Sequence, residues 1–258
     1  MGVETKTKAE PTAQLTSSDY VHLHNHTHHS LLDGLTKIPD LVERVKEMGM
    51  EAVAITDHGT MSGAVEFYKE AKDGGIKPII GMEAYVAARS RHDRDPAKDK
   101  ARYHLILLAM NETGYKNLMQ LSTKANLEGM YYKPRIDHDL LEEFNEGIIA
   151  LSACASGEIG ENLRNDNYDE AKRIAEWYKS VFGDRYYLEL QDHGHPDAPA
   201  KWDVQVGINK YLERLSKELD IPCVVTSDGH YPSHDDQDAH EILLCVGTGA
   251  FLSDEKRM

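Results

Sequence analysis

The chain has 258 residues, of which 40% are hydrophobic, so it can bury the core of one α/β barrel domain or of two small domains, and one domain is the simpler interpretation. A formal net charge of −15 excludes a broad basic surface that holds nucleic acid by itself, so an action on phosphates would require bound cations. Because the sequence has a polar N-terminus, no long apolar run and three cysteines without a CxxC pair, we expect a cytoplasmic protein with no membrane partner and no disulfide framework.

The predicted elements alternate between strands and helices. Residues 1–18 are polar and aperiodic and predict a disordered leader, and residues 19–258 predict one domain. β-rich runs predict strands over residues 20–26, 51–58, 77–87, 103–110, 147–154, 186–193 and 221–230. Apolar residues at helical spacing predict helices over residues 38–49, 64–75, 115–129, 168–183 and 206–220. This alternation is typical of βαβ units on a parallel sheet, with the charged segment 88–102 as a solvated, mobile loop.

The first predicted strand carries a run of histidines, VHLHNHTHHS, at positions 21–30. Because alternate residues of a strand share a face, His22, His24 and His26 are expected to point the same way. A purification tag would not be embedded in a β pattern. A half-exposed polar strand face and a metal-binding His-x-His pair both remain open from this segment alone.

Nearly every predicted strand ends in a side chain that can bind a metal. These strand-end residues are Asp57, His58, Glu83, Cys154, Glu189, Asp192, His193, Asp228 and His230. Each by itself could be a surface or capping residue, and Cys154 could be a small core residue. In a parallel barrel, however, the carboxyl ends of the strands meet at one mouth. The series therefore predicts a polynuclear metal site there, and Asp33 in SLLDG lies close enough in sequence to reach it.

Several of these segments resemble one family. LHNHTHHSLLDG, AITDHGTMSGAVEFYKEAK, IIGMEAYV, LSACASGEI, YLELQDHG and TSDGHY are similar to the PHP (polymerase and histidinol phosphatase) family, and the resemblance covers residues 19–258. YYKPRID and AHEILLCVGTG resemble its polymerase branch, which forms the N-terminal domain of bacterial DNA polymerase III alpha subunits. The resemblance implies a distorted (βα)7 TIM-like barrel with a three-metal cluster at the C-terminal strand ends.

The resemblance also implies the metal ligands. They would be His24, His26, Asp33, His58, Glu83, His104, Cys154, Asp228 and His230. His104 lies near the start of its apolar run, so its assignment depends on the resemblance alone. Asp57, His193 and His22 are expected to orient ligands, whereas Cys223 and Cys245 lie in apolar runs and are expected in the core.

The ligand types indicate the chemistry. Mixed imidazole and carboxylate sites suit two to three Zn, Mn or Fe ions, and Glu83, Asp228 and His230 are the expected catalytic residues. The leading hypothesis is a metal-dependent phosphodiesterase that proofreads DNA 3′ ends as a 3′–5′ exonuclease beside the remainder of the polymerase alpha subunit. We expect no polymerase activity from this chain. A non-catalytic, metal-stabilised scaffold domain and a free-standing phosphatase or phosphotriesterase are the alternatives. The basic residues Arg102, Lys133 and Arg135 could contact a phosphate chain or be solvated surface charges.

Overall fold

The computed structural model describes residues 16–193 and 199–254. The leader predicted over residues 1–18 therefore lies outside the described residues except for its last three. Ser17 and its neighbours form a short 3-10 turn, η1 (Ser17–Asp19). None of the helices in the described ranges is both long and apolar enough to cross a membrane.

Helices and strands alternate through the described chain. The helices are α1 (Ile38–Glu47), α2 (Ala64–Asp73), α3 (Glu112–Leu127), α4 (His138–Glu143), α5 (Glu158–Arg164), α6 (Tyr168–Phe182), α7 (Pro199–Leu219) and α8 (Gln237–Thr248). The strands are β1 (Ala52–Ile55), β2 (Lys77–Ala87), β3 (Arg102–Ala109), β4 (Met130–Tyr131), β5 (Lys133–Ile136), β6 (Ile148–Leu151), β7 (Tyr186–Gln191) and β8 (Cys223–Thr226). Two further 3-10 turns are η2 (Gly183–Arg185) and η3 (His234–Asp236). The five predicted helices are confirmed, whereas α4, α5 and α8 were not predicted.

The sheet is mixed, so the prediction of a parallel sheet is wrong at β3, and the short strand β4 is also antiparallel to its neighbour β5. Its strand order is β4-β5-β2-β3-β6-β7-β8, and β1 also pairs with β2. β3 runs antiparallel to both of its neighbours, β2 and β6, while the pairs of β1 with β2, β6 with β7 and β7 with β8 are parallel. The physical reason is the connection: segment 88–101 joins β2 to β3 without a crossover helix, so the chain reverses direction.

The predicted first strand is extended but forms only isolated bridges. His22 pairs with Val53 of β1 on one side, and Asn25 pairs with Gly229, just after β8, on the other. Backbone hydrogen bonds from Ala54 N to His22 O and from His26 N to Gly229 O support both contacts. Segment 20–26 therefore connects the two ends of the curved sheet and closes the barrel.

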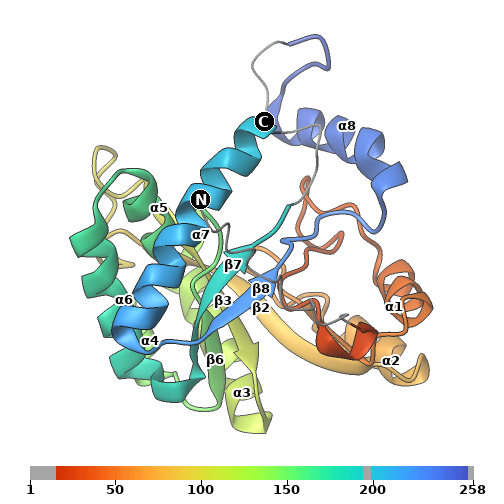
Figure 1. The fold of residues 1–258 in the computed structure, drawn as a ribbon, viewed down its shortest axis with the longest axis horizontal. Helices are drawn as coiled ribbons and strands as arrows, with labels where there is room; N and C mark the ends of the chain where they lie inside the picture. Colours follow the sequence, from red (N-terminus) through yellow and green to blue (C-terminus); the bar gives the residue numbers. More distant parts are fainter. Residues whose placement is uncertain (1–15, 194–198, 255–258) are drawn as a thin grey trace, which may run out of the picture.

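Helices cover the outside of this barrel, and apolar side chains fill part of its interior. Figure 1 shows α1 and α2 on one side of the strands, α5, α6 and α7 on the other, and α8 apart from both groups. Inside, Ala54, Ile106, Leu108 and Leu151 form a buried cluster. Because strand residues alternate in direction, the same inward face continues past these residues to the polar side chains at one end of the barrel.

The predictions for the two core cysteines have different outcomes. Cys223 is exposed rather than in the core, because it lies with Val225 on the outward face of β8, where Val225 is 47% exposed. Cys245 is buried, as predicted. Segment 88–101 is a loop in which most side chains are exposed, as predicted, but its backbone is anchored, because the buried Arg135 donates hydrogen bonds to the backbone oxygens of Arg91, Asp93 and Asp99.

Candidate metal centre

The nine predicted ligands gather at one end of the barrel. Most follow the carboxyl ends of parallel strands or of the closing segment 20–26. His24 and His26 lie within segment 20–26, Glu83 lies within β2, and His104 lies near the start of β3. Since β3 is antiparallel to β2, its beginning lies beside the end of β2, where His104 pairs with Tyr85. Strand direction thus explains how a residue that periodicity would not select reaches the same mouth.

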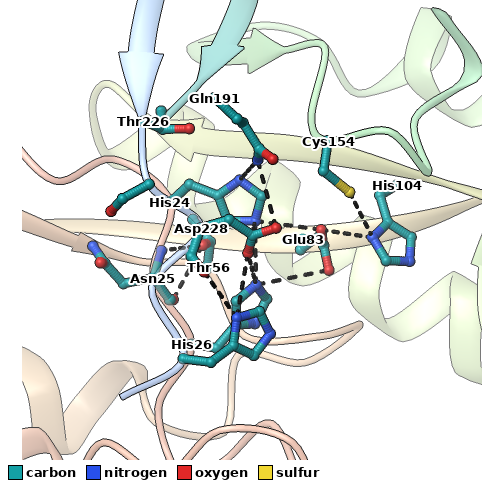
Figure 2. A network of polar contacts seen from close by, with 12 residues as sticks. His24, Asn25, His26, Thr56, Glu83, His104, Cys154, Gln191, Thr226 and Asp228 are labelled. Atoms are coloured by element: carbon teal, nitrogen blue, oxygen red, sulfur yellow. Dashed lines mark hydrogen bonds and ion pairs between the residues drawn. The ribbon is translucent and has the colours of Figure 1, made fainter. Parts of the chain in front are cut away.

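A first group consists of His24, His26 and Asp228, whose ligand atoms lie within 4.8 Å of one another. His24 Nε2 is 3.2 Å from His26 Nε2 and 3.1 Å from Asp228 Oδ1. His26 Nε2 is 3.3 Å from the same oxygen. Figure 2 shows these three side chains pointing toward one another, with Glu83 beside them. Two imidazole nitrogens and one carboxylate oxygen therefore converge on a single point.

A second group surrounds Glu83, which is completely buried. Glu83 Oε1 lies 2.8 Å from His104 Nδ1 and 3.4 Å from His24 Nε2, and Oε2 contacts His58 Nδ1. Cys154 Sγ is 3.6 Å from His104 Nδ1. The two oxygens of Glu83 thus face different histidines, which is the geometry of a carboxylate placed between two cation positions.

A third group joins the loop after segment 20–26 to the loop after β8. His26, His58 and His230 form a set of possible ligands within 4.8 Å, and the ring centroids of His26 and His230 are 4.2 Å apart. Asp33 Oδ2 is 2.8 Å from His58 Nε2, and Asp33 Oδ1 is 3.6 Å from His230 Nε2. All nine predicted side chains therefore take part in one connected cluster.

The pKa shifts of the cluster show ionised carboxylates beside imidazoles in different charge states: burial would lower the pKa of His58, but Glu83 and Asp33 raise it to about 10. Burial lowers the pKa of His26 to about 3, so its ring is neutral and able to bind a metal. Burial would raise the pKa of Glu83, but His104 and His58 hold that pKa well below its usual range. Burial, together with Asp228 and Glu83, raises the pKa of the Cys154 thiol well above its usual range. A coordinated cation would act in the opposite direction on that thiol.

Two buried carboxylate oxygens indicate whether divalent metals fit this cluster. Glu83 Oε1 and Asp228 Oδ1 accept no hydrogen bond, although His104 Nδ1 and His24 Nε2 lie 2.8 Å and 3.1 Å away. A buried carboxylate oxygen without a partner is costly. Divalent cations would satisfy these oxygens and the imidazole lone pairs together. The residues present therefore fit a cluster of divalent metals.

Neighbouring side chains determine which ring nitrogen of His24 and of His26 is free to bind a metal. Glu189 Oε1 accepts a hydrogen bond from His24 Nδ1 at 2.6 Å, which leaves the lone pair on Nε2 for the centre. Ser30 Oγ donates to Asp57 Oδ1 at 2.8 Å, so it accepts from His26 Nδ1 at 3.0 Å. Asp57 therefore orients His26 through Ser30.

The remaining predicted orienting residues are farther from the ligand atoms. His193 Nε2 contacts Gln191 Oε1 at 3.0 Å, and His22 Nδ1 contacts Ser227 Oγ at 3.3 Å. Gln191 in turn donates to Glu189 Oε1 at 3.1 Å. Sequence reasoning singled out Glu189 as a strand-end residue but did not find Ser30 or Gln191. The only signal for Gln191 is its position two residues after Glu189, on the same strand face.

Strained backbone accompanies three of the ligands. Leu32, Ala153 and Asp228 have φ values of 66°, 62° and 51°, in the left-handed region that residues other than glycine rarely adopt. Leu32 precedes Asp33 and Ala153 precedes Cys154, so these turns direct the ligands into the centre. At the third, the ligand residue Asp228 itself has the positive φ, whereas Gly229 after it does not. Such strain is concentrated at functional sites in proteins.

Comparison with known proteins identifies close relatives. A family profile described as the PHP domain matches residues 22–193. The chain is 47% identical over 242 residues to the DNA polymerase III subunit alpha of Borreliella burgdorferi, covering 93% of this chain and 20% of that protein. It is 46% identical over 246 residues to the DNA polymerase III subunit alpha of Deinococcus radiodurans, covering 92% of this chain and 18% of that protein. The chain thus spans about a fifth of the length of these relatives.

Two solved structures share the fold at low identity. An amidohydrolase from Chromobacterium violaceum, with bound sulfate and no metal, has a TM-score of 0.52 and 14% identity, covering 86% of this chain and 96% of that one. A protein from Bifidobacterium adolescentis, assigned as a metal-dependent phosphoesterase, has a TM-score of 0.50 and 18% identity, covering 86% of this chain and 89% of that one. These similarities confirm the predicted distorted TIM-like barrel.

Proposed function

The chain belongs to the PHP domain family, in the branch of the DNA polymerase III alpha subunits, and on this premise we propose that it is a metal-dependent phosphodiesterase that removes nucleotides from DNA 3′ ends. A 3′–5′ exonuclease within a replicative polymerase would serve proofreading. Its partners would be the frayed 3′ end of a primer and the remainder of the alpha subunit. Its place would be the cytoplasm, where bacterial DNA is replicated.

The convergence of the nine side chains supports this proposal most. Their three overlapping groups suit two to three divalent ions, with His, Asp, Glu and Cys donors appropriate to Zn, Mn or Fe. When bound, such cations lower the pKa of water and offset the charge of a phosphoryl group. The orphaned oxygens of Glu83 and Asp228 are the local sign that cations belong between these residues.

Specific side chains of the cluster would hold the cations in place. Glu83, with oxygens facing His104 and His58, would hold cations together with these histidines. Asp228 would hold a cation with His24 and His26, and Glu189 would keep the proton on His24 Nδ1. His230 Nδ1 lies 2.9 Å from the backbone oxygen of Asp228, which leaves its Nε2 free on the side of Asp33. Glu83, Asp228 and His230 are the residues we assign to catalysis.

A second candidate function is a metal-stabilised scaffold, and one observation favours it. α8 exposes Ile242 and Val246, and Phe251 and Leu252 are exposed just after it. An apolar surface of this kind is typical of a contact with another part of a protein. In this alternative the metals stabilise the fold and no phosphodiester is cleaved.

Hydrolysis assays separate the two candidates. The metal-loaded chain should release mononucleotides from a 3′-labelled single-stranded oligonucleotide and should hydrolyse bis(p-nitrophenyl) phosphate. A 5′-labelled copy of the same oligonucleotide reports the polarity, because a 3′–5′ exonuclease shortens it stepwise. Chelation should abolish both activities, and re-addition of Mn or Zn should restore them. A metal-loaded chain that cleaves neither substrate would favour the scaffold.

A further inference from the structure

An exposed tyrosine lies at the tip of a small hairpin formed by β4 and β5. We call residues 130–136 the tyrosine hairpin; in it Met130 pairs with Pro134 and Tyr131 pairs with Lys133. Tyr132, the turn residue, is 66% exposed and has a φ of 61°. Glycine or asparagine is the usual residue in this conformation. A bulky aromatic ring held in solvent by a strained turn points to a function rather than to folding.

The tyrosine hairpin lies beside the metal centre. β5 pairs with the end of β2, where Arg135 is opposite Tyr85. The Tyr85 ring centroid is 6.1 Å from that of His58 and 5.4 Å from that of His104. Gly59, which follows His58, is so close to Pro134 and Tyr85 that an added Cβ would lie 3.0 Å and 3.1 Å from them. The hairpin therefore packs directly against one wall of the cluster.

Three cations lie over the rings of Tyr85 and Tyr132, and unlike other basic residues nearby they form no ion pair in the described part of the chain. Lys133 Nζ and Arg102 Cζ lie 5.6 Å and 5.7 Å from the Tyr85 ring centroid, and Lys100 Nζ lies 5.9 Å from that of Tyr132. Within the described ranges, none of these three cations forms an ion pair with a carboxylate.

The other arginines of this region are already occupied. Arg89 pairs with Asp99, and Arg91 pairs with Asp137 and Glu128. The buried Arg135 donates to backbone oxygens and is not available to a phosphate, so the possibility raised for it from the sequence is wrong. Lys100, Arg102 and Lys133 are therefore available to a phosphate chain beside the cluster, in a chain whose net charge is −15.

We propose that the tyrosine hairpin, together with Lys100 and Arg102, binds single-stranded DNA and leads its 3′ end into the metal centre. Tyr132 would stack on a base, and Lys133 and Arg102 would contact the phosphates next to the scissile one. Exposed aromatic rings interleaved with cations are the usual platform for single strands. This inference rests on the proposed nuclease function for its substrate, and its binding test does not depend on catalysis.

Binding of a fluorescein-labelled oligothymidylate to the metal-depleted chain, followed by anisotropy, tests the hairpin directly. Tyr132→Gly removes the ring and suits the positive φ, and it should raise the Kd by about tenfold, the effect of one lost base–aromatic stack. Tyr132→Phe keeps the ring and should bind like the wild type. Lys133→Gln should weaken binding and reduce the dependence of log Kd on log salt by about one phosphate contact.

Controls separate this site from the chemistry and from general effects. Tyr68→Ala and Lys69→Gln change exposed residues of the same types on α2 and should leave binding unchanged. Both control variants should hydrolyse bis(p-nitrophenyl) phosphate and the oligonucleotide at the wild-type rate, because neither residue lies in the proposed binding site or in the metal centre. With the oligonucleotide, Tyr132→Gly should raise KM far more than it lowers kcat.

Two outcomes would overturn the inference. One is a wild-type chain that does not bind oligothymidylate, and the other is unchanged Kd in both Tyr132→Gly and Lys133→Gln. If the metal-loaded wild type cleaves neither substrate, the nuclease proposal fails, while a Kd raised by Tyr132→Gly and not by Tyr132→Phe still supports the strand-binding hairpin.

Discussion

Replacing Asp228 by asparagine tests the metal centre with little effect on the fold. Asparagine has nearly the same volume as aspartate and tolerates the left-handed conformation, with a φ of 51°, that this position requires. Alanine would lose the side-chain oxygens and strain the backbone, so its effect would be ambiguous. The Asn variant removes one negative charge and leaves one oxygen that can still bind a metal weakly.

The size of the effect follows from the distances. Asp228 Oδ1 lies 3.1 Å from His24 Nε2 and 3.3 Å from His26 Nε2, so a cation held by these nitrogens would be in direct contact with the carboxylate. Two unit charges about 4 Å apart interact by ~4 kcal/mol at an effective dielectric constant of about 20. The amide dipole would retain part of this, and a loss of about 2.7 kcal/mol corresponds to a roughly hundredfold slower reaction.

The assay is hydrolysis of bis(p-nitrophenyl) phosphate and of a 3′-labelled oligonucleotide at saturating Mn, with circular dichroism to verify folding. Asp220→Asn is the matched control, because Asp220 is exposed and has a φ of 52°, so the same chemical change occurs in the same backbone conformation away from the centre. Asp220→Asn should keep wild-type rates. A folded Asp228→Asn variant with wild-type rates on both substrates would refute the assignment of Asp228 to the site.

Three further predictions concern the metals, an orienting residue and a buried arginine. Purified protein should contain two to three transition-metal ions per chain by elemental analysis, and chelation should lower Tm because metal binding adds to folding free energy; less than one ion without uptake of Mn or Zn would contradict this. Glu189→Gln keeps the volume but weakens the hold on His24 Nδ1, so a metal titration should show about tenfold lower affinity, and an unchanged affinity would argue against the orienting role. Arg135→Met leaves several backbone oxygens of segment 88–101 without a donor and should lower the free energy of unfolding by about 3 kcal/mol in urea titrations; a loss below about 0.5 kcal/mol would show that these hydrogen bonds do not stabilise the segment.

Local pattern in the sequence determined much of the secondary structure. The periodic placement of apolar residues predicted α1, α2, α3, α6 and α7, because a helix that covers a sheet must present one apolar face. The β-rich runs predicted β1, β2, β3, β6, β7 and β8. These strands were recognisable because inward and outward residues alternate in a strand. Short elements such as α4 and the pair β4 and β5 carry too few residues for a period to be recognised.

The residue types of the candidate centre were also evident from the sequence, whereas its assembly was not. His58 and Asp228 stand at predicted strand ends and Glu83 lies within a predicted strand, where a barrel brings side chains together. His104 could be placed only from the resemblance, because its position depends on the antiparallel direction of β3. Strand direction is set by how the chain crosses between strands, and no local period records that.

Tertiary structure alone decided which groups touch across long stretches of chain. The contact of Glu189 with His24 joins residues 165 positions apart, and the buried Arg135 reaches the backbone oxygens of a segment that its sequence suggested was solvated. The left-handed backbone at Asp228, although a glycine follows it, is a further feature that only the structure shows. Local propensity describes what each segment does alone, but burial and polar contacts depend on which distant segment lies opposite. The sequence pattern therefore determined the elements and the ligand types, and packing determined how those ligands are oriented and combined.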